Sequence, residues 1–497
     1  MTMRAMDRTP LLAMVMTAVL GLAAAHPARA DEPKPCRLRG VEHEALCGSV
    51  KRALDPARPL GTQIDVHYAV LPALARNKKP DPVFFFAGGP GQSAIEIAPQ
   101  VAAMLSRFSN RRDIVLVDQR GVGRSAPLVC EADDLARPLA EQFDIDRQRK
   151  RLASCLDKLK ALPHGDLRFY TTTIAMADAD AVRSALGAEK VNIVGASYGT
   201  RAALEYQRQF PQRVRRMVID GVAPPDMVLP ASFSPDNQAA LDALFEACVK
   251  DKACSAREPQ LAERWRALLA SLPRRVTLAH PLTGRSEPIE LTRDVVLAMV
   301  RGPLYAPALA AALPVAIGEA ARGRFEPLAG LATSLGGRRS LRLAEGMHFA
   351  VVCAEDYPRL ARAGDKAGPD FGTQFANLYE EACPLIARGA VSEAFYTMPP
   401  APAATLVLSG GIDPATPPRH GLRAAKALGA KARHVVVPHA GHGVMGIGCM
   451  RDVLYRFIDA AGDDEALKVD AACVTAIPRP PMFALPEPRA GAVEGAK

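Results

Sequence analysis

Short runs of consecutive apolar residues recur along the chain and predict buried strands. Strands without polar alternation are typical of a parallel sheet covered by helices on both faces. An earlier segment, Thr62–Leu71, instead alternates apolar and polar residues, which predicts an antiparallel edge strand. The continuous runs are Val83–Phe86, Ile114–Val117, Val191–Val194, Met217–Ile219, Thr405–Leu408 and Val435–Val437.

Helical patterns lie between several of these strands. Arg147–Leu162 and Ile174–Leu186 are amphipathic. Alternation of strands and helices predicts an α/β protein with a mostly parallel sheet and right-handed crossovers.

A long segment that precedes the last two strands has almost no strand signal. Because the sheet resumes after it, we interpret this segment as a helical lid on the α/β core rather than as an independent domain. Helices are predicted there at Leu241–Val249, Leu261–Leu272, Thr292–Val300 and Leu309–Arg322.

The first residues carry a targeting pattern. Arg4 and Arg8 precede an apolar run, Leu11–Ala25, and Ala28-Arg29-Ala30 is a small-x-small cleavage site. A membrane anchor is the alternative, but the run is short for a bilayer and no later run approaches twenty apolar residues. We therefore expect a signal peptide, export to the periplasm or the extracellular space, and no stable membrane anchor.

The expected organisation has five parts. A tail rich in proline, alanine and glycine follows the last part of the core and is expected to be flexible. The parts are a signal peptide at 1–30, the first part of the α/β core at 31–225, a helical cap or lid at 226–398, the C-terminal part of the core at 399–476, and the tail at 477–497.

Composition narrows the class of protein. With 497 residues and 49% hydrophobic content, the chain is globular. Its net charge of +9 is not gathered in a long basic stripe, so nucleic acid is not an expected partner. No cysteine or histidine spacing indicates zinc, and we expect neither a metal nor a cofactor. The oligomeric state is left open.

The ten cysteines fit an oxidising compartment. Sequence alone does not fix their connectivity, and pairing of neighbours along the chain is a hypothesis. It joins Cys36 to Cys47, Cys130 to Cys155, Cys248 to Cys254, Cys353 to Cys383, and Cys449 to Cys473.

The candidate nucleophile is Ser197. It stands in Gly195-Ala196-Ser197-Tyr198-Gly199, between a predicted strand and a predicted helix at Thr200–Phe210. Gly-x-Ser-x-Gly in that context is the pattern of a nucleophile elbow, where small neighbours permit a strained turn.

Serine needs a base, and the base needs an orienting acid. His442, in a Gly-His-Gly loop after the last strand, is the candidate base, with His439 and His434 as rivals. Asp413 follows the preceding strand and is the candidate acid. Asp220 is its competitor, because some hydrolases place the acid after the earlier strand.

An oxyanion hole requires two backbone N–H groups. Tyr198, directly after the serine, is expected to supply one. Gly89, in Ala87-Gly88-Gly89-Pro90-Gly91 after an early strand, is expected to supply the other. The glycine-rich loop is alternatively a plain turn or a phosphate cradle, although no Gly-Lys-Ser/Thr follows it.

Several motifs together resemble the proline iminopeptidase and tripeptidyl aminopeptidase family of α/β hydrolases, including its secreted branch with a TAP-like C-terminal segment. The resemblance implies an α/β-hydrolase fold, a Ser197–Asp413–His442 triad, an oxyanion hole at Gly89 and Tyr198, and peptide substrates with free N-termini. The motifs are Ala-Gly-Gly-Pro-Gly at 87–91, Asp-Gln-Arg-Gly-Val-Gly-Arg-Ser at 118–125, Gly-Ala-Ser-Tyr-Gly-Thr at 195–200 and Ile-Asp-Gly-Val at 219–222.

The resemblance also bears on substrate recognition. Ala87 departs from the histidine of many relatives, but backbone donors do not need that side chain. Aminopeptidases of this type hold the substrate ammonium with acidic groups, and Glu355 is the candidate here, although acidic pairs in helical insertions are commonly only solvated. Asp118 and Arg120 are expected to brace the adjacent loop.

The sequence therefore predicts a secreted serine exopeptidase. A carboxylesterase or other acyl hydrolase is the alternative, because the triad does not select the leaving group. A binding protein without turnover is a further possibility from another class.

Overall fold

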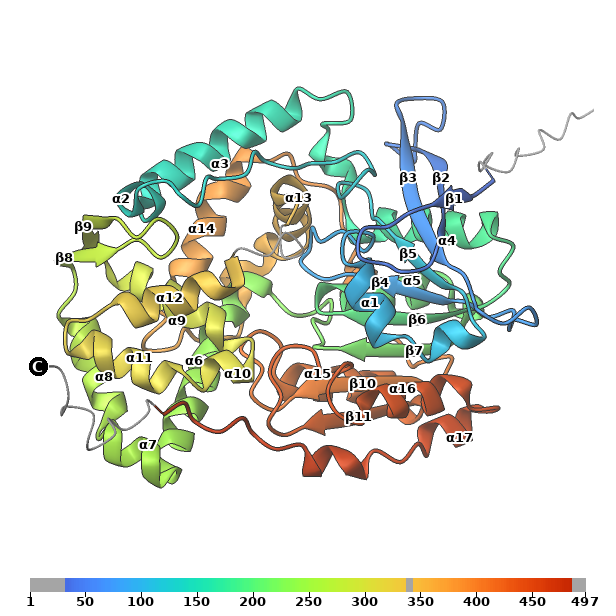
Figure 1. Ribbon diagram of the computed structural model, residues 1–497. Coiled ribbons are helices and arrows are strands. Elements are labelled where there is room, and N and C mark those ends of the chain that lie inside the picture. The colour runs from blue at the N-terminus through green and yellow to red at the C-terminus, as the bar shows by residue number, and fades with distance from the viewer. Residues whose placement is uncertain (1–31, 337–342, 485–497) are drawn as a thin grey trace, which may run out of the picture.

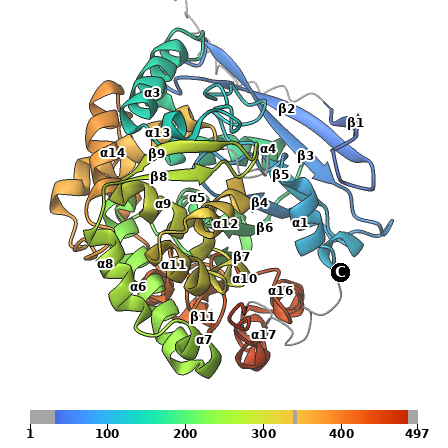
Figure 2. The ribbon, with the colours of Figure 1, turned by 60° about the vertical axis from the view of Figure 1, so that its left-hand side comes forward.

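The computed structural model describes residues 32–336 and 343–484 (Figure 1). The predicted signal peptide at 1–30 and the end of the predicted tail, 485–497, lie outside the described residues. A sheet runs through the core, and a second group of helices lies beside one end of it (Figures 1 and 2).

The central sheet has nine strands in the order β1-β2-β3-β5-β4-β6-β7-β10-β11. From β5 to β11 all neighbouring strands are parallel, as predicted. The strands are β1 (Lys34–Cys36), β2 (Ala45–Ala53), β3 (Gln63–Leu71), β4 (Val83–Phe86), β5 (Ile114–Val117), β6 (Val191–Ala196), β7 (Val214–Asp220), β10 (Thr405–Gly410) and β11 (Ala432–Val437).

The antiparallel strand β3 is not at the edge, which corrects the sequence prediction. β3 pairs antiparallel with β5 on one side and with β2 on the other, and β1 pairs with β2 outside it. The segment Ala45–Ala53 includes Gly48, Lys51 and Arg52 and lacks a regular alternation, so it gave no strand signal.

The helices of the core lie on both faces of the sheet. Ile193 of β6 packs into one hydrophobic cluster with α4, α5 and α15, whereas its neighbour Val194 packs into the other with α1, α16 and α17. Both faces are thus covered, which is why these strands are continuous apolar runs. The helices are α1 (Ala98–Met104), α4 (Thr172–Ala185), α5 (Tyr198–Gln209), α15 (Pro418–Leu428), α16 (Met450–Asp459) and α17 (Asp463–Leu467).

The segment between β7 and β10 builds most of the cap, together with α2 (Leu139–Gln142) and α3 (Ile145–Lys160). Its own hydrophobic cluster includes Trp265, which is fully buried. The helices are α6 (Leu229–Lys250), α7 (Lys252–Arg257), α8 (Leu261–Ala270), α9 (Arg293–Leu304), α10 (Pro307–Ala310), α11 (Leu313–Ala321), α12 (Glu326–Gly336), α13 (Glu345–Glu355) and α14 (Gln374–Ala382).

The sequence predicted a helical cap, but the cap also contains two strands. Strands β8 (Arg274–Ala279) and β9 (Ser286–Leu291) form an antiparallel hairpin on its outer side (Figure 2). Leu278 is the one buried residue of β8, Ile289 and Leu291 are those of β9, and charged residues interrupt the apolar pattern. The predicted helix Leu309–Arg322 is also divided into α10 and α11, and Pro314, which lacks an N–H group, lies in the first turn of α11.

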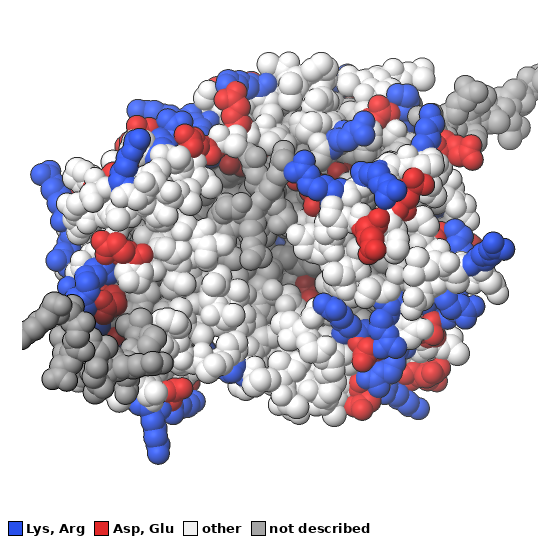
Figure 3. All heavy atoms as spheres, viewed as in Figure 1, with Lys and Arg blue, Asp and Glu red and all other residues white. Residues whose placement is uncertain are grey.

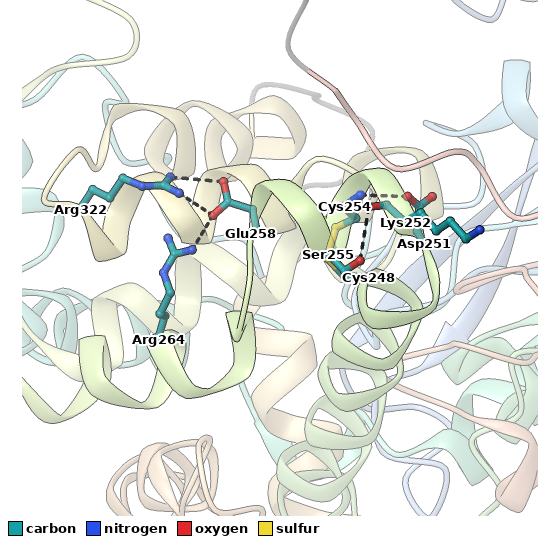
Figure 4. The surroundings of a disulfide bond; sticks show 8 residues. All are labelled: Cys248, Asp251, Lys252, Cys254, Ser255, Glu258, Arg264 and Arg322. Carbon is teal, nitrogen blue, oxygen red and sulfur yellow. Dashed lines mark hydrogen bonds and ion pairs between the residues drawn. A yellow bond between two sulfur atoms is a disulfide. The ribbon is translucent and has the colours of Figure 1, made fainter.

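Five disulfides join the cysteines in the predicted sequential pairing, which is thereby confirmed. The disulfide Cys248–Cys254 ties the end of α6 to α7 (Figure 4). In the same region Glu258 accepts hydrogen bonds from Arg264 at 2.8 Å and Arg322 at 3.0 Å, so a buried carboxylate is neutralised within the cap.

Positive and negative side chains lie side by side around the rim of the face in Figure 3. Among the described residues, no helix combines the length and apolar character that crossing a membrane requires. The described start of the tail, 477–484, has no helix or strand, and it contacts the cap where Phe483 N donates to Ala311 O at 2.9 Å.

Candidate active site

Ser197 lies in a strained turn between β6 and α5. Its φ of 55° and ψ of −124° are unusual for a residue with a side chain. Its N–H donates to Asp220 O at 2.9 Å, which fixes the turn against β7. A Cβ added at Gly195 would lie 2.3 Å from Gly199 O, and one at Gly199 would lie 2.0 Å from Phe86 O. The two glycines therefore permit the close packing that the elbow requires.

Tyr198 is the first residue of α5, and a first-turn N–H has no partner within its own helix. Its side chain turns inward, where its hydroxyl lies 2.6 Å from Thr172 Oγ1. Burial raises the pKa of the Tyr198 phenol, so the hydroxyl stays protonated. The tyrosine thus anchors the start of α5 while its backbone N–H stays beside the serine.

His442 and Asp413 come together from the loops that follow β11 and β10. Nδ1 of His442 donates to Oδ2 of Asp413 at 2.8 Å. The carboxylate is fully buried, and it also accepts from the N–H groups of Ala415 at 2.8 Å and Thr416 at 2.9 Å. Four donors, counting the Thr416 hydroxyl at 2.9 Å, hold this carboxylate in one orientation.

The electrostatics of the pair favour a charged acid and a basic imidazole. Burial opposes ionisation of Asp413, but the charge and hydrogen bond of His442 outweigh it and hold the pKa of the carboxyl below its usual range. Burial likewise opposes protonation of His442, but Asp413 outweighs it and raises the pKa of the imidazole.

The imidazole of His442 lies at the same edge of the sheet as Ser197. A Cβ added at Gly221, next to the Asp220 carbonyl that holds Ser197 N, would be 3.2 Å from His442 Cε1. On its other side, His442 contacts the cap. Its backbone N–H donates to Tyr305 O at 3.1 Å, and the centroids of the two side-chain rings are 5.3 Å apart. Nδ1 is used by Asp413, which leaves Nε2 for a proton transfer.

The rival residues have other contacts. Asp220 Oδ2 accepts from the N–H groups of Val444 at 2.7 Å and Met445 at 2.8 Å, and burial raises the pKa of Asp220 to about 6. Its carboxylate holds the loop after His442 rather than the imidazole. His434 Nε2 lies 3.0 Å from Ser409 Oγ, and His439 is exposed.

The glycine-rich loop after β4 lies directly against the elbow. A Cβ added at Gly88 would lie 3.1 Å from Ser197 Cβ. Gly89 has a φ of 110°, which a residue with a side chain rarely adopts. The loop therefore brings the Gly89 backbone near the serine, where sequence analysis expects an oxyanion donor.

Two polar groups brace this region. Asp118 Oδ1 accepts from Ser93 Oγ at 2.7 Å and Ile95 N at 3.1 Å, and burial raises its pKa to about 6. Arg120 donates to both oxygens of Asp178, at 2.7 and 3.0 Å. Both contacts are internal, as expected of bracing residues.

Glu355 lies at the end of α13 and is almost fully buried. Its Oε1 accepts from Thr172 N at 2.7 Å and its Oε2 from Arg201 at 3.4 Å. Burial raises its pKa to about 7. Arg201 also forms a two-pronged ion pair with Asp356, at 2.9 and 3.1 Å. These contacts join α13 of the cap to the helix that follows the nucleophile.

Sequence reasoning missed two polar residues of this region. Thr416, which donates to Asp413, is three positions after the acid in Asp413-Pro414-Ala415-Thr416, a spacing typical of a side-chain-capped turn. Arg201 gave no signal, because its acidic partners are more than 150 positions away. Within the described residues, no group of three or more His, Cys, Asp or Glu side chains is arranged to hold a metal ion.

Comparison with known families gives two matches. A family model described as alpha/beta hydrolase fold matches residues 81–309, and one described as TAP-like protein matches residues 368–471. The first contains Ser197 and Gly89, and the second contains Asp413 and His442.

Individual relatives are peptidases by name. The serine protease Hip1 of Mycobacterium tuberculosis is 35% identical over 224 residues, 40% of this chain and 42% of the relative. The tripeptidyl aminopeptidase of Streptomyces coelicolor is 32% identical over 199 residues, 36% of this chain and 35% of the relative. A proline iminopeptidase of Neisseria meningitidis is 29% identical over 28% of this chain and 32% of the relative. The matched segments span less than half the length of these relatives.

Proposed function

The chain belongs to the α/β-hydrolase fold family and has a TAP-like C-terminal domain, and from this premise we propose that it is an exported serine exopeptidase. Its substrates are peptides with free N-termini, from which it releases residues or short peptides. The observation that carries the proposal is the hydrogen bond between His442 and buried Asp413 beside the strained Ser197 elbow.

In the proposed mechanism, Ser197 Oγ attacks the carbonyl carbon of the scissile bond while Nε2 of His442 takes its proton. Asp413 fixes the tautomer through Nδ1–H and stabilises the imidazolium that forms. The resulting oxyanion accepts from the N–H groups of Gly89 and Tyr198. Their place beside Ser197 supports this assignment.

Collapse of the tetrahedral intermediate breaks the C–N bond, and His442 returns its proton to the leaving amine. The acyl group is then esterified to Ser197. A water molecule, deprotonated by His442, hydrolyses this ester and releases the amino-terminal fragment, which restores the free serine. The relatives' names as peptidases support a peptide rather than another acyl substrate.

A pair of measurements tests the proposal. A fluorophosphonate probe should label the wild-type protein and leave Ser197→Ala unlabelled; a wild-type chain that never labels would indicate a binding protein. Unblocked peptidyl p-nitroanilides should be hydrolysed, and their N-acetylated counterparts much more slowly. Equal turnover of blocked and free substrates, or turnover of esters alone, would favour the acyl hydrolase instead.

A further inference from the structure

Helix α13 lies in the cap segment but packs into the core. In both ribbon views it lies between α14 of the cap and α4 of the core (Figures 1 and 2). Nine of its eleven residues are buried. Its apolar side chains belong to the hydrophobic cluster that contains Ile193 of β6 rather than to the separate cluster of the cap. The disulfide Cys353–Cys383 also joins α13 to the end of α14, so the helix is a firm support between the two parts of the molecule.

The start of α13 lies on the glycine-rich loop that follows β4. Ala344 N, directly before the helix, donates to Gly91 O at 2.8 Å. A Cβ added at Gly91 would lie 2.8 Å from Ala344 O, so this close approach requires glycine. One turn further along, His348 Nδ1 donates to Pro90 O at 3.1 Å. Two consecutive carbonyl groups of the loop are therefore held by one helix.

The orientation of the His348 imidazole follows from its two partners. A carbonyl oxygen only accepts, so Nδ1 carries the proton that points to Pro90 O. Nε2 then accepts from the hydroxyl of Tyr379 on α14, at 2.8 Å. Burial lowers the pKa of His348, which keeps the imidazole neutral at neutral pH. The side chain is thus a neutral donor of fixed orientation between α14 and the loop.

Pro90 is the neighbour of Gly89, the proposed oxyanion donor. The loop is a tight turn, in which Gln92 N donates to Gly88 O at 3.3 Å. Gly88 in turn lies against the nucleophile, since its added Cβ would be 3.1 Å from Ser197 Cβ. In so short a turn, a displacement of Pro90 also moves the Gly89 N–H group relative to the serine. An oxyanion donor is effective only where it points at the developing charge.

The last residue of α13 supports the other side of the proposed oxyanion hole. Glu355 Oε1 accepts from Thr172 N at 2.7 Å, and the Thr172 hydroxyl lies 2.6 Å from the hydroxyl of Tyr198. Both Thr172 and Tyr198 are buried. Because Tyr198 is the first residue of α5, its anchored side chain fixes the start of the helix and thereby its own backbone N–H group.

We propose that α13 positions both donors of the oxyanion hole, and that His348 is the positioning residue for the Gly89 side. His348 does not touch the substrate. It holds the Pro90 carbonyl so that the Gly89 N–H group points at the oxyanion, while Thr172, held by Glu355, does the same for Tyr198. The inference rests on the proposed serine mechanism and deepens it, because the cap then takes part in the chemical step as well as in access to the site.

Two variants of His348 separate its two hydrogen bonds. In His348→Asn the side-chain amide lies where Nδ1 was and still reaches Pro90. In His348→Gln the longer side chain places the amide where Nε2 was, so the contact with Tyr379 is kept and the one with Pro90 is lost. His348→Gln should therefore lower kcat by about 10–100-fold with little change in KM, and His348→Asn should keep most of the wild-type kcat. Both p-nitrophenyl acetate and an unblocked peptidyl p-nitroanilide serve as substrates.

Binding of phenylboronic acid gives a readout that a merely structural role would not change. The oxygen of Ser197 adds to boron, its proton passes to His442, and a boron-bound oxygen occupies the oxyanion hole of the tetrahedral adduct. The inhibition constant should rise in His348→Gln by about the factor by which kcat/KM falls, because the adduct resembles the transition state.

The matched control is His164, whose Nε2 lies 3.2 Å from another proline carbonyl, Pro127 O, at an exposed position. His164→Gln should behave as wild type in both assays. Thr172→Val tests the Tyr198 side independently. It removes the hydroxyl but keeps the N–H group that binds Glu355, and it should also lower kcat with little change in KM.

Equal kcat values in His348→Asn and His348→Gln, or an unchanged inhibition constant for phenylboronic acid in His348→Gln, overturn the positioning role of His348. An unchanged kcat in Thr172→Val overturns the Tyr198 side. Failure of the exopeptidase proposal has a different signature, since the wild-type protein then hydrolyses the acetate ester but no unblocked peptide. In that case the two His348 variants are compared on the acetate ester alone.

Discussion

Oδ2 of Asp413 lies 2.8 Å from Nδ1 of His442, across the ends of the two last strands of the sheet. The parallel pairing of β10 with β11 brings the two loops to one edge. The carboxylate is fully buried, and the imidazole is only 18% exposed. Replacing either partner therefore leaves a buried polar group without its match.

Asp413→Asn should lower kcat by about 10³–10⁴-fold with little change in KM. An amide in this place donates as well as accepts, so it no longer selects the tautomer of His442 that has a free Nε2. Steady-state kinetics with an unblocked peptidyl p-nitroanilide measure the effect. Asp220→Asn is the comparison variant. If its kcat falls further than that of Asp413→Asn, Asp220 rather than Asp413 is the acid of the triad.

The pH profile should report the influence of Asp413 on His442. His442 acts as a base only when neutral, and its pKa is raised above the ordinary 6.5 because Asp413 outweighs burial. kcat/KM should therefore increase with pH through a midpoint above 6.5. In Asp413→Asn this midpoint should move to lower pH, since burial then acts without the compensating charge. If the midpoint does not move in Asp413→Asn, a group other than His442 controls the increase of kcat/KM with pH.

Gly199→Ala should damage the elbow, because the added Cβ would lie 2.0 Å from Phe86 O, a backbone atom. A shift of about 1 Å at the nucleophile is sufficient to cost on the order of 10²-fold in kcat. Gly330→Ala is the matched control: no atom lies within 4 Å of its added Cβ, and it is in helix α12. That variant should keep full activity and gain up to about 1 kcal/mol of stability. Equal activity of the two variants would contradict the packing argument.

Glu355 should make the protein less stable as the pH rises. Burial raises its pKa from 4.5 to about 7 in the folded state, so the folded state binds a proton that the unfolded state has lost. Its contribution is full below pH 4.5, and it is lost as the pH rises through about 7, with a change of at most about 3 kcal/mol.

Thermal unfolding at pH 5 and pH 8 measures this effect. Glu355→Gln, which stays neutral, should show a smaller difference in Tm between the two values than the wild type does. Its KM for unblocked peptides separates the two roles of Glu355. A rise in this KM with an unchanged kcat would support binding of the substrate ammonium by Glu355.

The parallel strands could be predicted because each is buried on both faces, so their sequences are almost free of polar residues. Val191–Val194 and Val83–Phe86 are clear examples. The outer strands were not predicted in the same way. Only Ala45 and Val50 of β2 are buried, and its pairing with β3 depends on long-range contacts that its own residues do not encode.

The candidate site residues were predicted from local motifs next to strands. The contacts of Arg201 and His348 show where such reasoning ends. Arg201 meets Asp356 across 155 positions, and His348 meets Pro90 across 258 positions. Neither residue lies in a motif, and only the packing of the cap on the core brings the partners together. A cavity lined by residues of α3, α9, α13 and α14 could not be predicted either, because these helices are far apart in the sequence.

The order of the strands also determines when, during synthesis, the candidate triad becomes complete. Ser197 lies on β6, whereas Asp413 and His442 follow β10 and β11, which are synthesised only after the whole cap. Domains form from the N-terminus onward during synthesis. On the proposed mechanism, the base His442 is synthesised 245 residues after Ser197 (442 − 197), so a nascent chain carries its serine over that length without the base that activates it. The growing chain is thus protected from its own peptidase activity until the last strands have docked.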